Sequence, residues 1–202
     1  RKMKVSLLLK RIVDIALSAV LSTALLPVFV LLAVLIAFDS KGGVFYRQER
    51  VTQYGKTFKI LKFRTMTADA DKTGLQITVG DDKRITGIGG FLRRYRMDEL
   101  PQLFNILMGD MTFVGTRPEV PGYVEKYTPK MRATLLLPAG VTSRASIHYK
   151  DEADLLDGAE NAEKVYTDQI LPAKMHYNLE SLGKFSLWED LKVMILTVRE
   201  VL

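Results

Sequence analysis

The sequence predicts a helix-rich, mixed α/β protein, with two apolar helices at the N-terminus followed by one small domain. Residues 15–38 are apolar and uncharged and contain Pro27 near their middle. Two short stretches behind them have the residue types of strands, and several later stretches carry apolar side chains at helical spacing. A chain of 202 residues is long enough to bury one core.

The apolar segment is long enough to meet a membrane. A straight helix over residues 15–38 would measure about 36 Å, and a bilayer core is about 30 Å thick. Pro27 interrupts the helical hydrogen bonds, and we expect the hydroxyls of Ser22 and Thr23 to replace some of them. Basic residues, which favour the cytoplasmic side, flank the segment on both sides: Lys4, Lys10 and Arg11 before it, and Lys41, Arg47 and Arg50 after it.

Two basic flanks indicate that the chain enters and leaves the bilayer on one face. We therefore predict a re-entrant helix hairpin over residues 1–39, with arms at 10–26 and 27–38. A single span with a proline kink is the alternative. No cleavage site of a signal peptide follows the segment. Because the chain begins with Arg1 rather than Met, we expect it to be a piece of a longer protein.

Residues 40–202 are expected to form the second, catalytic domain. Short strands are predicted at 44–46, 58–64 and 111–114, and residues 67–82 are predicted to form a loop. Short helices are predicted to end near Tyr95 and to run from Asp98, as the N-cap, to Gly109. A helix with a kink at Pro172 is predicted over 160–180.

The last predicted helix begins with a capping box, in which Glu189 follows Ser186 by three residues. Its apolar side chains fall on one side and suit either a membrane interface or the core. They are Leu187, Leu191, Met194, Ile195 and Val198.

The composition restricts the kinds of binding partner, cellular compartment and metal ion that we expect. The net charge is +6, and basic residues are concentrated at 41–64 and 83–96. Such blocks suit anionic lipid or a phosphorylated substrate, and no nucleic-acid-binding motif is present, so no nucleic-acid partner is expected. The chain has no cysteine, which excludes disulfides and favours a reducing compartment. Its two histidines are far apart, so any metal should be a hard cation bound by carboxylates.

The adjacent carboxylates Asp98 and Glu99 are the leading candidates for chemistry. Three arginines, Arg93, Arg94 and Arg96, precede them directly. Taken singly, Asp98 would be a helix cap and Glu99 a solvated first-turn charge. Together with the cations, the pair suits reaction at a phosphorus centre, where positive groups hold the phosphate oxygens.

Four segments in one order resemble the bacterial sugar transferase family of monotopic phosphoglycosyl transferases. The resemblance covers essentially the whole chain. The segments are Lys62-Phe63-Arg64-Thr65-Met66, Met97-Asp98-Glu99-Leu100-Pro101-Gln102-Leu103, Asn105-Ile106-Leu107-Met108-Gly109-Asp110-Met111 and Val114-Gly115-Thr116-Arg117-Pro118-Glu119.

The resemblance implies transfer of a phosphosugar from a UDP-sugar to polyprenol (undecaprenyl) phosphate, with release of UMP, at the start of glycoconjugate or polysaccharide assembly. It implies that Asp98 is the nucleophile, forms an aspartyl-phosphosugar intermediate and binds Mg²⁺, with Glu99 assisting. It also implies that Lys62, Arg64, Arg93 and Arg117 hold phosphate or nucleotide.

The expected location is the cytoplasmic face of the bacterial inner (plasma) membrane, in contact with its lipid. A homo-oligomer, the identity of the sugar and the downstream glycoconjugate are left open. Two alternatives remain: a non-catalytic membrane-bound scaffold of the same fold, and a hydrolase that cleaves phosphodiesters with the same carboxylates. The chain departs from the usual family pattern at Leu26-Pro27, where Ser-Pro is usual, and at Thr116, where Pro is usual.

Overall fold

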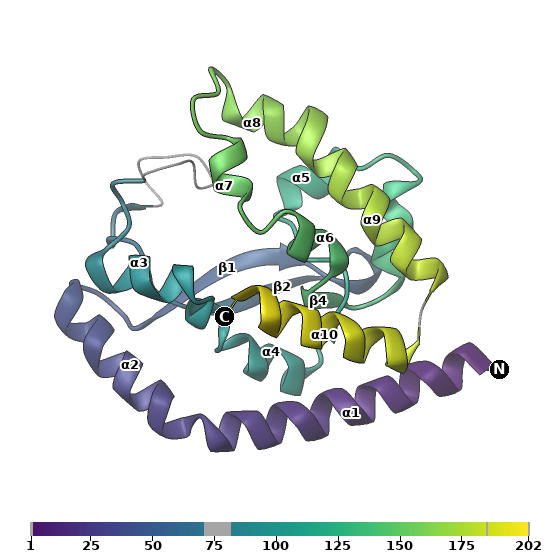
Figure 1. Ribbon diagram of the computed structural model, residues 1–202, viewed down its shortest axis with the longest axis horizontal. Coiled ribbons are helices and arrows are strands. Elements are labelled where there is room, and N and C mark those ends of the chain that lie inside the picture. Colours follow the sequence, from purple (N-terminus) through teal and green to yellow (C-terminus); the bar gives the residue numbers. More distant parts are fainter. Residues whose placement is uncertain (1, 71–81, 185, 202) are drawn as a thin grey trace.

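Two consecutive helices form one long edge of the molecule (Figure 1). The computed structural model describes residues 2–70, 82–184 and 186–201. Helix α1 (Lys2–Ala24) and helix α2 (Leu26–Asp39) meet at Leu25, with Pro27 in the first turn of α2. Proline is tolerated there because the first helical N–H groups have no intrahelical partner. The predicted break at Pro27 is therefore confirmed.

The two helices are bent by 61° relative to each other, so the pair is an open bend and its arms do not fold back on one another. Across the described ranges, neither helix taken singly has the length and apolar character to cross a bilayer, whereas the bent pair does when both are counted. The membrane topology and the division into residues 1–39 and 40–202 stay predictions.

The hydroxyls near the break behave differently from each other. Thr23 Oγ1 donates to the carbonyl of Ala19 at 2.9 Å, a side-chain contact that favours bending of a helix. The hydroxyl of Ser22 is buried and has no hydrogen-bond partner in the described part of the chain. The prediction that these hydroxyls replace hydrogen bonds lost at Pro27 was therefore wrong: that of Thr23 bonds a carbonyl further upstream, and that of Ser22 bonds none in the described chain.

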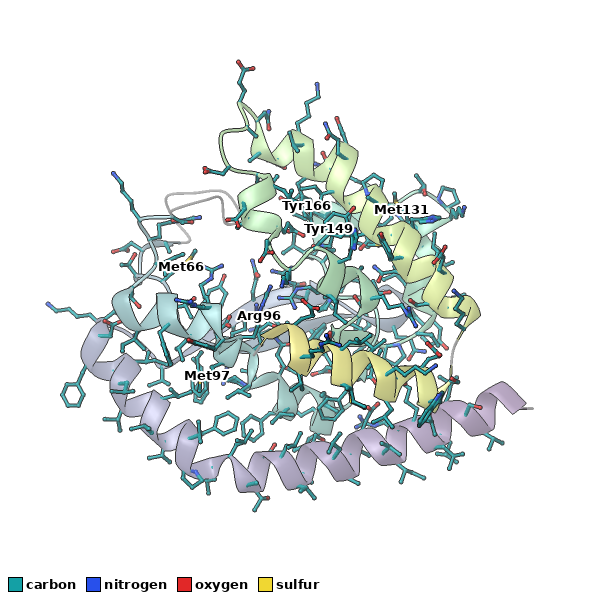
Figure 2. All side chains as sticks on the ribbon, viewed as in Figure 1. Met66, Arg96, Met97, Met131, Tyr149 and Tyr166 are labelled. Atoms are coloured by element: carbon teal, nitrogen blue, oxygen red, sulfur yellow. The ribbon has the colours of Figure 1, made fainter. Side chains whose placement is uncertain are left out.

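The bent pair has a packed side and an open side. Phe29, Leu32 and Ile36 of α2 are buried against Phe58 and Phe63. Figure 2 shows side chains projecting from the outer edge of α1 and α2, away from the other elements. This outer surface is apolar and includes Val20, Leu26, Val30, Leu31, Val34 and Phe38.

Strands β1 (Phe45–Val51) and β2 (Thr57–Phe63) pair as an antiparallel hairpin, with Tyr46 opposite Lys62. Both predicted strands are confirmed, and β1 runs five residues beyond the predicted Tyr46. A short 3-10 turn, η1 (Gln53–Gly55), joins the two strands. Of the predicted loop, residues 71–81 lie outside the described residues.

The segment after β2 contains three short helical elements: α3 (Gly87–Arg94), η3 (Met97–Glu99) and α4 (Gln102–Met108). The prediction that Asp98 caps the helix was wrong. Helix α4 begins after Pro101 without a side-chain cap, and Asp98 lies four residues earlier, in the 3-10 turn. The helix ends as predicted at Gly109, whose φ of 96° suits a residue without a side chain.

A second sheet consists of β3 (Met111–Val114) and β4 (Ala139–Thr142), which pair in parallel. The sequence predicted β3 but not β4. Four short elements lie between these strands or follow them in the chain. They are α5 (Pro121–Glu125), η4 (Met131–Leu136), α6 (Arg144–His148) and α7 (Glu152–Leu155). Helices α1, α4 and the last helix, α10 (Leu187–Val201), pack on the sheet.

The predicted helix over 160–180 is present in three parts: α8 (Ala162–Val165), a π-helical turn η5 (Tyr166–Ile170) and α9 (Leu171–Gly183). Pro172 lies in the first turn of α9, directly after the π turn, so the predicted interruption at this proline is confirmed. Buried residues of this region pack on Tyr123 and Tyr127.

Helix α10 (Leu187–Val201) closes the described chain, and the N–H of Glu189 donates to Ser186 Oγ at 3.2 Å, as the capping box predicts. Its buried residue is Val193, whereas Leu187, Leu191, Ile195 and Val198 are exposed. The apolar stripe therefore does not join the core.

Candidate active site

Lys62 comes from the inward face of β2. Phe58 and Ile60 precede it at two-residue spacing and are buried, so Lys62 shares their side of the strand. Lys59 lies on the other face and is exposed, as the alternation predicts. The hairpin thus directs one cation toward the interior while keeping the other in solvent.

A sharp reversal places the two carboxylates. Arg96 has a φ of 55°, in the left-handed region, directly after α3. The chain then makes the 3-10 turn η3 and enters α4 at Pro101. Asp98 and Glu99 are consequently held on a tight turn between two helices, and their side chains are only 10% and 11% exposed.

Arg117 is presented by the loop that follows β3. The loop is tied to β4 because the N–H of Gly115 donates to the carbonyl of Thr142, and the N–H of Gly140 donates to that of Thr116. Gly115 and Gly140 lie so close that a Cβ on Gly140 would be 2.1 Å from the nitrogen of Gly115. Two glycines are therefore needed where this loop meets β4.

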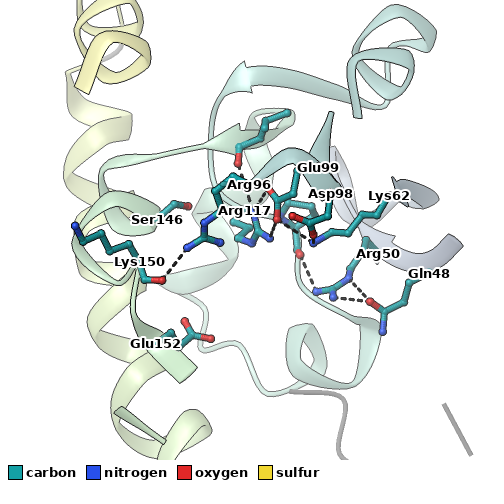
Figure 3. Close-up of polar contacts among 12 residues, drawn as sticks. Gln48, Arg50, Lys62, Arg96, Asp98, Glu99, Arg117, Ser146, Lys150 and Glu152 are labelled. Carbon is teal, nitrogen blue, oxygen red and sulfur yellow. Dashed lines mark hydrogen bonds and ion pairs between the residues drawn. The ribbon is translucent and has the colours of Figure 1, made fainter. Parts of the chain in front are cut away.

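Glu99 connects the three elements (Figure 3). Lys62 Nζ donates to Glu99 Oε1 at 2.9 Å, and Arg117 Nη1 donates to Glu99 Oε2 at 3.0 Å. Arg117 Nη2 also donates to Glu99 Oε1, so the guanidinium and the carboxylate form a bidentate pair. Glu99 thereby fixes both cations next to Asp98.

Asp98 is much less engaged. Its closest charged partner is Lys62, with Nζ 4.0 Å from Oδ2, and within the described ranges its carboxylate accepts no hydrogen bond. Burial raises the pKa of Asp98, against the attraction of Lys62 and with the repulsion of Glu99. Burial also acts on Glu99, but Arg117 and Lys62 outweigh it and hold the pKa of Glu99 well below its usual value.

The cations have matching shifts. Burial lowers the pKa of Lys62, and Glu99 only partly offsets this effect. The pKa of Arg117 is raised, chiefly by Glu99. Two neighbouring carboxylates therefore differ in kind: Glu99 is a bound counterion, and Asp98 is a carboxylate whose oxygens remain available for reaction.

A cavity of about 1650 Å³ opens onto this pair, large enough for two substrates. All six predicted site residues line it: Lys62, Arg64, Arg93, Asp98, Glu99 and Arg117. Arg64 is turned toward the loop before β1, where its Nη2 donates to the carbonyl of Ser40 at 3.1 Å. Burial lowers the pKa of Arg93, whose charge is attracted to Asp98. The binding roles of the four cations stay predictions.

A second buried network, which the sequence did not predict, lies on the wall of this cavity. Tyr166 donates to Glu119 Oε1 at 2.7 Å, and Lys174 Nζ lies 3.5 Å from the same oxygen. Lys174 also donates to Glu152 at 2.8 Å, and Arg50 donates to the carbonyl of Pro118 at 3.1 Å. This network anchors the chain immediately after Arg117 to α9.

The carboxylates of the site offer few ligands for Mg²⁺. Throughout the described residues, no group of three or more metal-binding side chains (His, Cys, Asp or Glu) is present. Both oxygens of Glu99 are taken by cations, whereas those of Asp98 are not. Mg²⁺ commonly uses one or two carboxylates and completes its shell with phosphate and water, so Asp98 fits as its protein ligand.

The cavity wall thus carries basic side chains, two of them held by Glu99, beside a carboxylate without a hydrogen bond in the described chain, an arrangement that suits a phosphorylated substrate. The chain belongs to the bacterial sugar transferase family, whose model matches residues 5–202.

The relatives it matches have related names. A Bacillus subtilis protein, provisionally named an undecaprenyl-phosphate N-acetylgalactosaminyl 1-phosphate transferase, is 45% identical over 121 residues, which are 60% of this chain and 68% of that protein. The UDP-glucose:undecaprenyl-phosphate glucose-1-phosphate transferase of Escherichia coli is 35% identical over 96% of this chain. A UDP-N-acetylgalactosamine-undecaprenyl-phosphate N-acetylgalactosaminephosphotransferase of Aeromonas hydrophila is 30% identical over 96%. The chain spans only 40% and 44% of the last two proteins.

Proposed function

We propose that the protein is a phosphoglycosyl transferase that moves a phosphosugar from a UDP-sugar to polyprenol (undecaprenyl) phosphate and releases UMP. The observation that carries the proposal is the unequal engagement of the two carboxylates. Glu99 is held by Lys62 and Arg117, whereas Asp98 accepts no hydrogen bond within the described chain. The names of the relatives support the same reaction class.

In the first step, an oxygen of Asp98 attacks the phosphorus that carries the sugar. A bond forms between that oxygen and phosphorus, and the bond from phosphorus to the bridging oxygen breaks, so that UMP leaves with the electron pair. In the second step, an oxygen of polyprenol phosphate attacks the same phosphorus and displaces Asp98. The covalent intermediate divides one transfer into two displacements.

The surrounding residues favour both steps through charge. Lys62, Arg93 and Arg117 line the cavity and supply positive potential for phosphate oxygens. Mg²⁺, when bound at Asp98, would reduce the repulsion between this carboxylate and the diphosphate. We propose that the outer apolar surface of α1 and α2 contacts the lipid of the inner membrane, with the site at its cytoplasmic surface; the exposure of that apolar surface supports the lipid contact.

Mass spectrometry after incubation with a UDP-sugar alone tests the proposal. We expect a sugar-phosphate adduct on Asp98 and about one equivalent of UMP, with repeated turnover only after polyprenol phosphate is added. The Asp98→Asn variant should form no adduct and lose at least about 10³-fold in rate. Asp157→Asn, at an exposed carboxylate outside the cavity, is the matched control.

The rival functions give different results in this experiment. A hydrolase would release UMP repeatedly and free sugar phosphate without the lipid. A scaffold protein would show neither an adduct nor turnover with any UDP-sugar of a panel. Full activity of Asp98→Asn would contradict the covalent route.

A further inference from the structure

Gln102 is a fully buried side chain whose polar atoms are unused. It is the first residue of α4 and is 0% exposed. Within the part of the chain that the structure describes, neither its Oε1 nor its Nε2 has a hydrogen-bond partner. A buried amide without partners is unfavourable, and such groups are rare in folded proteins. Its amide therefore has hydrogen-bonding capacity that no described residue uses.

A second buried amide in the same helix shows the contrast. Asn105 Nδ2 donates to the carbonyl of Lys59, and Asn105 Oδ1 accepts from the N–H of Leu61, both at 2.9 Å. Asn105 thus fastens α4 to β2 with both ends of its amide. Gln102, three residues earlier, fastens nothing, so its amide has no structural role of this kind.

Gln102 lies on the wall of the cavity that holds Asp98 and Glu99. It follows Asp98 by four residues, and the chain between them is wound as a 3-10 helix, with the N–H of Leu100 donating to the carbonyl of Met97 and that of Leu103 to the carbonyl of Leu100. A substrate bonded to Asp98 through phosphorus would extend into this same cavity, so its substituents would meet the wall to which Gln102 belongs.

The amide itself restricts the partner. It offers two N–H donors and one carbonyl acceptor. Phosphate oxygens only accept hydrogen bonds, so a phosphate would leave Oε1 of Gln102 unpaired. Lys62 and Arg117 are already available to hold phosphate oxygens. A hydroxyl both donates and accepts. In a UDP-sugar, the hydroxyls closest to the attacked phosphorus belong to the sugar, whereas the uracil is separated from it by a phosphate and the ribose.

We infer that Gln102 hydrogen-bonds hydroxyl groups of the sugar that is transferred. This inference rests on the proposed function and adds to it a residue that contacts the sugar. Gln102 would be unsatisfied in the free protein and satisfied when the donor is bound. The free-energy cost of the unpaired amide would then be removed only when the sugar is bound, which favours donors that carry the sugar.

The test compares Gln102→Met with the wild-type protein. Methionine keeps the length of the side chain but removes both polar groups. We expect kcat/KM for the active UDP-sugar, assayed with UDP-glucose and UDP-N-acetylgalactosamine, to fall about 10- to 100-fold. Inhibition by UDP, which lacks the sugar, should be unchanged. The melting temperature should stay the same or rise, because a buried unpaired amide is removed.

Asn105→Leu provides the structural contrast, since it breaks the bonds to β2 and should lower the melting temperature. Two results would overturn the inference. Wild-type kcat/KM in Gln102→Met would assign the amide to a buried water, and an equal loss of UDP and UDP-sugar binding would assign it to the nucleotide or phosphate.

A failure of the proposed function would look different. If the wild-type protein releases no UMP with any donor, calorimetric titration with UDP-glucose and with UDP replaces the rate measurement. Selective loss of UDP-glucose binding in Gln102→Met would still support the sugar contact. Absence of a difference between the two ligands would reject it.

Discussion

At the scale of single residues, Asp98 and Glu99 differ because of their partners and not because of their exposure. Their side chains are similarly buried, but Glu99 has two cationic partners at hydrogen-bond distance, and Asp98 has one at 4.0 Å. A carboxylate that already accepts several charge-assisted hydrogen bonds is a poor nucleophile, because an attack must break them. The arrangement therefore assigns fixed charge to one residue and reactivity to the other.

Glu119 is a buried charge outside the carboxylate pair for which the structure predicts a pH-dependent stability. Burial acts to raise its pKa, but Lys174, Arg50 and Tyr166 outweigh burial, and the net pKa is lowered from 4.5. A carboxyl with a lowered pKa in the folded state stabilises the fold above its unfolded pKa, and this stabilisation is lost as the pH falls through the folded value.

We therefore predict that Glu119→Gln lowers the free energy of unfolding by about 3–5 kcal/mol at neutral pH, because Lys174 and Arg50 lose their buried counterion. The difference from wild type should shrink as the pH falls below about 4.5. Denaturant unfolding over a pH series measures both effects.

The control for this prediction is Glu163→Gln. Glu163 is about half exposed and 3.5 Å from Lys126, so its loss should change the stability by about 0–1 kcal/mol at any pH. A Glu119→Gln difference that does not vary with pH would contradict the assigned pKa shift.

At the scale of secondary-structure elements, α1 is attached to the domain by polar side chains on one of its faces. Lys10 Nζ pairs with Asp190 of α10 at 2.5 Å, and Asp14 accepts from Thr112 Oγ1 at 2.6 Å. Arg11 donates to the carbonyls of Ile106 and Leu107 at 2.6 and 3.1 Å. Both carbonyls lie in the last turn of α4, where that of Ile106 also accepts from the N–H of Gly109 at 3.1 Å, so Arg11 adds a charged cap to the helix that follows the carboxylates.

Removal of this cap should destabilise the protein. We predict that Arg11→Met lowers the free energy of unfolding by about 1–3 kcal/mol, because two carbonyl groups lose a charged donor. The free energy of unfolding of Arg11→Lys should lie between those of Arg11→Met and wild type. An ammonium keeps the positive charge but lacks the two guanidinium nitrogens that reach both carbonyls. Thermal denaturation of the three proteins checks the order.

Arg132→Met is the matched control, because Arg132 is exposed and its side chain makes no hydrogen bond or ion pair within the described residues. It should melt like the wild-type protein. If Arg11→Met and Arg132→Met melt at the same temperature, Arg11 does not cap α4 in solution.

The elements also show which features local sequence could predict. The break at Pro27, the strands of the β1–β2 hairpin and the end of α4 at Gly109 depend on neighbouring residues, and all three were predicted correctly. Strand β4 was missed, since its parallel pairing with β3 joins residues that are far apart in the chain. Parallel pairs need such long connections, which leave no local turn signal.

The candidate site divides in the same way. The motif residues Lys62, Asp98, Glu99 and Arg117 could be selected from sequence, and the structure brings their side chains together. The predicted capping role of Asp98 was wrong, because the left-handed Arg96 and the 3-10 turn shift the helix start to Gln102. The contact between Glu119 and Lys174 joins residues 55 positions apart and has no sequence signal.

At the scale of the whole molecule, two apolar surfaces remain uncovered in the described structure. One is the outer surface of α1 and α2, and the other is the exposed face of α10, which includes Trp188 and Ile195. Exposed apolar side chains that are grouped on one helix surface suit contact with lipid. The bend of 61° gives the helix pair the shape of an open wedge.

The proposed membrane contact predicts that charge on the outer surface of α2 weakens binding to lipid. Leu31 and Val34 are 58% and 47% exposed, so aspartate at either position should leave the fold intact. Each substitution should cost about 3 kcal/mol of insertion free energy if the position lies deep in the bilayer. Flotation with vesicles that contain an anionic phospholipid should show a stepwise loss from Leu31→Asp to the double variant with Val34→Asp.

Leu155→Asp is the control that separates a membrane effect from a general effect of the substitution. Leu155 has the same 58% exposure, but it lies on α7, on the far side of the β1–β2 hairpin from α1 and α2 (Figure 1). This variant should float with vesicles like the wild-type protein. If it loses binding as much as Leu31→Asp does, or if the double variant still floats fully, the outer surface of α2 is not the lipid-binding surface.

Because the three positions are exposed helical sites, circular dichroism should show the same helix content in every variant. Any difference in flotation then reports on lipid contact alone.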